Sequence, residues 1–140
     1  MLGGVWLAGT MAGDSTFDVR TVFGLVGGMD AFDRMVATFY EGVEADPVLR
    51  PMYADEDLTA SRRRLSMFLA QFFGGPSTYS EERGHPRLRM RHFPFPIDAA
   101  ARDRWMLHMS RAVEAERFPE EVSAAMMEYF ERAATFLVNR

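Results

Sequence analysis

The chain has 140 residues, a mass of 15.9 kDa and a formal net charge of −4, with 48% hydrophobic residues and no cysteine. This length suits one domain with a substantial core, and the hydrophobic content excludes a disordered chain. The negative charge argues against a general nucleic-acid binder. The lack of cysteine excludes disulfides, thiolate catalysis, zinc fingers and iron–sulfur clusters. We expect a single-domain, cytoplasmic protein.

The first residues, 1–13, are apolar and rich in glycine. They lack the basic segment of a signal peptide and are too short to span a bilayer, so no membrane role is expected. We expect residues 1–20 to form a flexible N-terminal extension, with Met11 as a second candidate start. Residues 21–140 are expected to form the folded domain.

Four segments carry the apolar spacing of amphipathic helices. The first runs from Met29 to Ala45 and the second from Leu58 to Phe73, where Gly74-Gly75-Pro76 ends it. Asp98 is suited to cap the third helix, and Pro119 is suited to the first turn of the fourth. No segment alternates with a period of two, so the domain is predicted to be all-α.

Shorter segments connect these helices. Asp46, Pro47 and Pro51 mark a short irregular or single-turn segment that leads to Tyr53, and residues 77–84 are expected to form a loop. A short helical turn over 88–92 follows, and Pro94 stops it.

The segment from His85 to Phe95 reads His-Pro-Arg-Leu-Arg-Met-Arg-His-Phe-Pro-Phe. It places His92 between arginines and aromatic rings. The iron of a haem needs a neutral imidazole nitrogen, its propionates need cations, and the macrocycle needs apolar walls. The pattern is therefore compatible with haem ligation by His92. The alternative is a short-helix histidine facing solvent, beside arginines that form an ordinary solvated face.

The two other histidines are weaker candidates. His85 precedes Pro86 and fits loop structure. His108 lies three positions after Trp105, which places it on a neighbouring face of the third helix.

Further motifs occur in a distinctive order. They are Val26-Gly27-Gly28, Phe39-Tyr40, Leu49-Arg50-Pro51, Tyr53, Arg64-Leu65, Gly74-Gly75-Pro76, Thr78-Tyr79-Ser80-Glu81, Arg83 to His92, Pro94-Phe95, Arg102-Asp103 and Trp105. With them, the region from Phe23 to Asn139 resembles the group II truncated haemoglobins of bacteria, most specifically from Gly74 to Phe95. The resemblance implies a 2-on-2 helical sandwich around haem b, which agrees with the four amphipathic helices.

The resemblance also implies roles for individual residues. His92 matches the proximal ligand of the haem iron. Tyr40, Tyr53 and Trp105 match two tyrosines and a tryptophan of the distal side, and Ser61 matches the small residue that replaces a distal histidine.

Helical spacing adds Leu65 and Phe68 as an apolar distal wall. The residues expected to contact the cofactor along its edge are Arg64, Tyr79, Met90 and Arg91. The chain departs from the family pattern at Phe72-Phe73, where a Tyr-Trp pair is common, and at Ala54, where proline is common. Both departures concern the packing of the pocket.

The implied function is reversible binding of dioxygen and other diatomic ligands, such as nitric oxide and carbon monoxide, at ferrous iron. Hydrogen bonds from the distal side chains are expected to slow oxygen release. One alternative is a haem enzyme that oxidises nitric oxide or reduces peroxide with electrons from an unknown reductase. Another is a haem-free helical module that binds an acidic partner, with Trp105 and both tyrosines packed in its core. A homodimer is also expected, whereas a nucleic-acid partner is not.

Overall fold

The computed structural model describes residues 17–53 and 57–140 of the chain. In chain order the elements are η1 (Val19–Thr21), α2 (Val22–Leu25), α3 (Met29–Glu44), η2 (Arg50–Met52), α4 (Thr59–Phe72), α5 (Thr78–Arg83), α6 (Leu88–His92), α7 (Ala99–Glu116) and α8 (Glu120–Phe136). The described residues contain no strand, so the predicted all-α fold is confirmed. None of their helices is long and apolar enough to cross a membrane.

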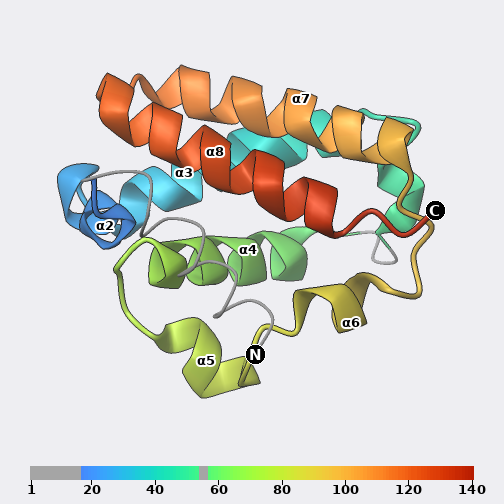
Figure 1. The fold of residues 1–140 in the computed structure, drawn as a ribbon, viewed down its shortest axis with the longest axis horizontal. Coiled ribbons are helices and arrows are strands. Elements are labelled where there is room, and N and C mark those ends of the chain that lie inside the picture. Colours follow the sequence, from blue (N-terminus) through green and yellow to red (C-terminus); the bar gives the residue numbers. More distant parts are fainter. Residues whose placement is uncertain (1–16, 54–56) are drawn as a thin grey trace.

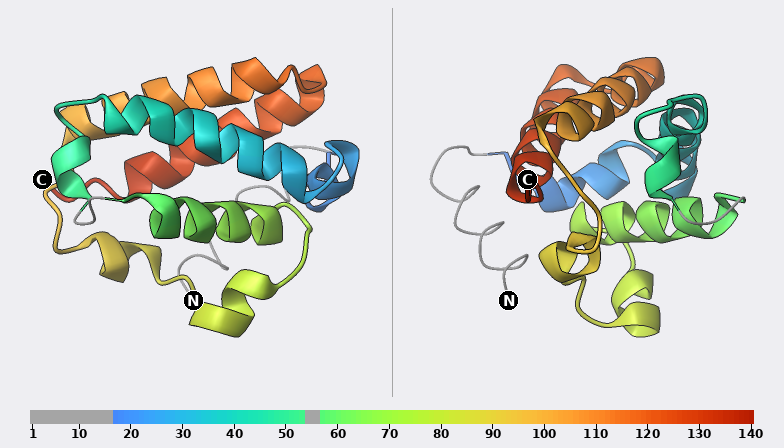
Figure 2. Two further views of the ribbon diagram at one scale, coloured as in Figure 1. Left: turned by 180° about the vertical axis from the view of Figure 1, so that it is seen from behind. Right: turned by 90° about the vertical axis from the view of Figure 1, so that its right-hand side faces the viewer.

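The four long helices form two pairs, α3 with α4 and α7 with α8 (Figure 1). The pairs meet chiefly where α3 packs against α7. The short helices α5 and α6 lie beyond α4, on the side away from α7 and α8, and the reverse view agrees (Figure 2).

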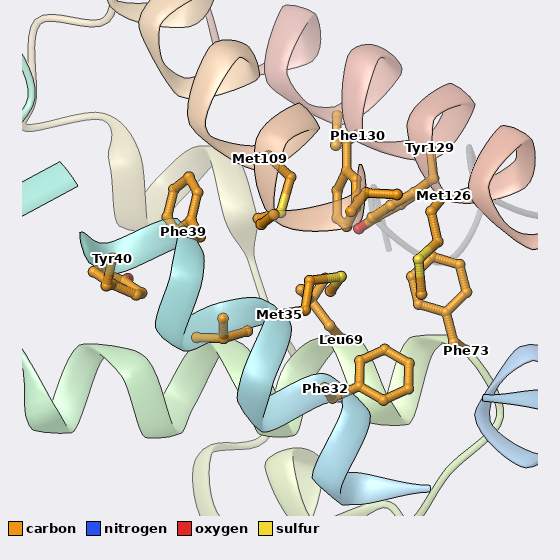
Figure 3. Close-up of a cluster of buried hydrophobic side chains, with 14 of the residues drawn as sticks. Phe32, Met35, Phe39, Tyr40, Leu69, Phe73, Met109, Met126, Tyr129 and Phe130 are labelled. Carbon is orange, nitrogen blue, oxygen red and sulfur yellow. The ribbon is translucent and has the colours of Figure 1, made fainter. Parts of the chain in front are cut away.

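The core lies between the two pairs. The apolar stripe of α3 buries Phe32, Met35 and Phe39 completely, because residues three and four apart share one face of a helix. Figure 3 shows Phe39 on the side of Met109 of α7, whereas Phe32 lies at the other end of the cluster, and its ring stacks on that of Phe73. The same figure places Tyr40 at the margin of the cluster.

The predicted helix ends are largely confirmed. The Asp98 side chain accepts a hydrogen bond from the Ala101 amide at 2.8 Å and so caps α7. Pro119 immediately precedes α8. Gly74 ends the α4 segment with φ +100°, and a side chain at this position would collide with the backbone carbonyl of Arg20.

The predicted loop at 77–84 is wrong, because α5 occupies most of it. Six residues are too few to show a helical period. The helix is held instead by a residue of α4: the Gln71 side chain donates to the Ser80 hydroxyl at 2.7 Å and accepts from the Ser80 amide at 2.9 Å. The Tyr79 side chain is buried against the domain.

Most of the predicted N-terminal extension, residues 1–16, lies outside the described residues, as does Ala54. Residues 17–20 are described. Phe17 and Val19 pack against the core, and Asp18 caps η1 by accepting from the Arg20 amide at 2.9 Å.

Phe73 is the residue whose truncation we expect to destabilise this core most clearly. Its side chain is 0% exposed, and its ring contacts those of Phe32 and Tyr129 with centroids 6.0 and 5.7 Å apart. Phe73→Ala should lower the free energy of unfolding by about 3–5 kcal/mol, measured by denaturant titration. Leu25→Ala, at a side chain 57% exposed, is the control and should change it by less than about 0.5 kcal/mol.

Candidate functional site

His92 is the last residue of α6. Its Nδ1 lies 2.7 Å from the carbonyl oxygen of Leu88. A carbonyl can only accept, so Nδ1 carries the proton and Nε2 keeps a free lone pair. Burial lowers the pKa of His92, and the positive charge of Arg91 lowers it further. A neutral imidazole with one free nitrogen is the donor that an iron ion requires.

No side chain of α6 is fully buried, and hydrogen bonds hold the helix in place. The Arg91 guanidinium donates to the carbonyls of Pro86 at 2.8 Å and Arg83 at 3.3 Å. It therefore fixes α6 to the connection from α5. Arg87, which precedes α6, has a left-handed backbone with φ 47°.

A second anchor comes from the end of α8, which sequence reasoning missed. Asn139 donates from its side chain to the Phe95 carbonyl at 3.0 Å and accepts from the Ile97 amide at 2.9 Å. Its own amide donates to the Ile97 carbonyl at 2.8 Å. A single asparagine near the chain end has no periodicity that could have indicated this contact.

The predicted distal residues form one row of aromatic contacts. The ring of Trp105 packs on Phe39 with centroids 5.1 Å apart, Phe39 packs on Tyr40 at 5.0 Å, and Tyr40 packs on Tyr53 at 5.7 Å. These residues come from α3, α7 and the segment after η2. The fold thus brings together three side chains that are far apart in the sequence.

Both tyrosines are protonated at neutral pH. Burial, the nearby Tyr53 and a hydrogen bond donated to the Tyr53 hydroxyl raise the pKa of Tyr40 far above its ordinary value. Burial raises the pKa of Tyr53 to about 12. Because Tyr53 accepts from Tyr40, its own hydroxyl proton is available for another acceptor. Among the described residues, no group accepts a hydrogen bond from the indole N–H of Trp105.

Three further predicted residues lie on the partly exposed face of α4. The Arg64 guanidinium donates to the Ser61 hydroxyl at 3.2 Å, and its charge acts on Tyr40. Leu65 packs against the core but is only partly buried, although it is apolar and lies within the helix. This face therefore offers apolar surface with a cation at its edge, which suits a flat apolar group that carries carboxylates.

The other residues predicted near the cofactor differ in their burial and in their contacts. Phe68 packs on Tyr79 with ring centroids 5.4 Å apart, so these two residues form one aromatic pair between α4 and α5. Met90 is 59% exposed. Arg91 already bonds two carbonyl groups, as described above. His85 is exposed, and its Nδ1 accepts from the Arg87 amide at 3.1 Å, in keeping with loop structure.

Comparisons with known proteins show the family of this chain. A family model described as bacterial-like globin matches residues 21–139. A group 2 truncated haemoglobin of Bacillus subtilis is 38% identical over 113 residues, which is 81% of this chain and 85% of the relative. The chain belongs to the group II truncated haemoglobins.

Solved structures give the same result. The thermostable haemoglobin of the actinobacterium Thermobifida fusca is 53% identical, with a TM-score of 0.83, and the match covers 84% of this chain and 96% of that one. The truncated oxygen-avid haemoglobin of Bacillus subtilis is 36% identical, with a TM-score of 0.80, over 84% and 98% of the two chains. The predicted 2-on-2 globin fold is confirmed. This truncated haemoglobin carries haem b with iron and binds oxygen as a globin does.

Proposed function

We propose that this truncated haemoglobin is a cytoplasmic protein that binds oxygen tightly and releases it slowly. The observation that carries the proposal is the row of hydrogen-bond donors formed by Tyr40, Tyr53 and Trp105, together with the free Nε2 of His92. When haem is bound, its ferrous iron supplies the coordination position at which dioxygen and other diatomic molecules bind.

The residues that would hold the haem follow from their chemistry. His92 would ligate the iron through Nε2, because its Nδ1 is already committed to Leu88. Leu65 and Phe68 supply apolar surface on α4. Arg64 and the hydroxyl of Tyr79 would bind the carboxylates of the cofactor. Arg91 and Met90 would contact the cofactor from α6.

Slow release follows from the number of donors. Trp105 can only donate, and Tyr53 has a proton left to donate after accepting from Tyr40. If each aligned hydrogen bond contributes on the order of 1 kcal/mol, these two slow dissociation by about ten- to a hundredfold. The similarity to the oxygen-avid truncated haemoglobin of Bacillus subtilis supports this expectation.

The alternative is catalysis on the same side chains, as oxidation of nitric oxide or reduction of peroxide. The hydrogen-bonded pair Tyr40–Tyr53 favours the reduction of peroxide, because a protonated hydroxyl can assist cleavage of the O–O bond. Either reaction needs electrons from an external reductase. A homodimer also stays a prediction, which the molecular mass in solution would test.

The test of the proposed function is kinetic. Purified protein loaded with haem should show a strong Soret band, and the oxygenated ferrous form should release oxygen slowly in stopped-flow mixing with carbon monoxide. Rapid release would contradict the proposal. Fast decay of the oxygenated form on mixing with nitric oxide, or of the ferric form with peroxide, would favour the enzymatic alternative.

A further inference from the structure

A buried polar cluster lies where the elements that carry the distal residues meet. It centres on Asp46, which follows α3 and has a side chain 0% exposed. One carboxylate oxygen accepts from Nε2 of His108 at 2.6 Å and from Nε of Arg104 at 2.9 Å, both on α7. The other accepts from the amides of Val48 at 2.8 Å and Leu49 at 3.2 Å. One side chain therefore joins α7 to the loop after α3.

The cluster is charged. Burial by itself raises the pKa of Asp46, but the hydrogen bonds from His108, Val48, Arg104 and Leu49 outweigh it and hold the pKa well below its ordinary range. A carboxylate can only accept, so Nε2 of His108 carries the proton that it donates. A buried carboxylate deprived of such partners is strongly destabilising, which makes the cluster sensitive to the position of α7.

Hydrogen bonds lead from Asp46 to Tyr53. The Asp46 carbonyl accepts from the Arg50 amide at 2.9 Å, and the Arg50 carbonyl accepts from the Tyr53 amide at 3.1 Å. The Arg50 guanidinium donates in turn to the Tyr53 carbonyl at 3.1 Å. The backbone that carries the Tyr53 ring is thus placed by the turn that Asp46 organises.

The two residues that α7 contributes to the cluster lie on either side of Trp105 in the sequence. Arg104 directly precedes Trp105 on α7, and His108 follows it by three residues, close to one helical turn. The ring of His108 also lies against Gly42 of α3, where any side chain would collide with it. Gly42 lies two residues after Tyr40, so α3 and α7 approach closely beside this tyrosine.

We propose that Asp46, Arg104 and His108 are positioning residues of the distal pocket, which hold Tyr53 and Trp105 in the geometry that lets both donate to one ligand. The inference rests on the proposed function, because it concerns the direction in which the proposed distal donors point. Hydrogen bonds weaken steeply with misalignment, so a small shift of α7 against the turn that carries Tyr53 separates donors that a ligand needs together.

Three variants of the cluster separate its contacts. Asp46→Asn keeps an oxygen for the amides of Val48 and Leu49 but replaces the oxygen that accepts from α7 with an amide nitrogen. His108→Met removes the donor on α7, whereas His108→Gln retains an N–H that can reach Asp46. The matched control is Glu116→Gln, which breaks an ion pair to Arg34 at 3.0 Å that also joins α3 to α7, but near the C-terminal end of α7.

The readouts are the infrared C–O stretching band of the carbon monoxide complex, which reports donors near the ligand, and the rate of oxygen release. Asp46→Asn and His108→Met should shift or split the band and speed release about tenfold, the loss of one aligned donor. His108→Gln and Glu116→Gln should keep the wild-type band and rate.

Wild-type behaviour of both Asp46→Asn and His108→Met would overturn the inference. So would an equal shift in Glu116→Gln, since that would indicate general loosening between α3 and α7. If Asp46→Asn does not fold, the comparison of His108→Met with His108→Gln decides. Failure of the proposed function is distinguishable, because it would show as rapid oxygen release from the wild-type protein itself.

Discussion

Replacing His92 with glycine is expected to abolish normal haem ligation in this truncated haemoglobin. In our proposal the Nε2 of His92 is the protein's bond to the iron, and its Nδ1 bond to Leu88 at 2.7 Å sets the direction of the ring. Glycine removes the ring and leaves room for a small ligand. The purified variant should contain little haem or show a Soret band different from that of the wild-type protein, in both oxidised and reduced spectra.

Added imidazole should restore the wild-type spectrum of His92→Gly, because it supplies the missing nitrogen in the space that the substitution leaves. His85→Gly is the matched control: it removes an exposed histidine from the same segment and should leave the spectrum unchanged. A native spectrum in His92→Gly would contradict the assignment of the ligand.

Removing the distal donors is expected to have the second largest effect. Trp105→Phe keeps an aromatic ring beside Phe39 and Phe130 but loses the indole N–H, so oxygen release should become about tenfold faster. Combining it with Tyr40→Phe and Tyr53→Phe removes both groups that can donate to the ligand, Trp105 and Tyr53, and also the hydroxyl of Tyr40 that donates to Tyr53, so release should become about a hundredfold faster. Stopped-flow mixing of the oxygenated form with carbon monoxide measures both changes.

Tyr129→Phe serves as the control for this series. Tyr129 is a buried tyrosine of α8 whose ring stacks on Phe72 at 4.1 Å, so it belongs to the core and not to the distal row. Its substitution should leave the rate of release unchanged. A triple variant that releases oxygen at the wild-type rate would show that Tyr40, Tyr53 and Trp105 are packing residues only.

The described structure agrees with the sequence where the signal is local. The stripe of Phe32, Met35 and Phe39 predicted α3, and Asp98 predicted the start of α7, because helical period and capping act within a few residues. The helix α5 was missed for the opposite reason. Its six residues show no period, and Gln71, nine residues before Ser80, supplies the contacts that hold it.

The site also combines residues that a local pattern indicates with residues whose contacts only the fold brings about. His92 could be singled out because a histidine among arginines and aromatic rings is a pattern of one short segment. The position of His108, three residues after Trp105, predicts a neighbouring face of the helix and makes it a weaker ligand candidate than His92. In the structure His108 bonds to Asp46, a loop residue before Pro47 that the sequence indicates only as part of an irregular or single-turn segment.

By itself, the sequence determined the four long helices of this truncated haemoglobin, the family to which it belongs and the histidine expected to hold its haem. These depend on residue types at short spacing. Tertiary structure alone decided the partners that orient the site: His108 meets Asp46 across 62 residues, and Asn139 meets Phe95 across 44. The physical reason is that a hydrogen bond needs two groups within about 3 Å, and only the crossing of packed helices brings such distant residues that close.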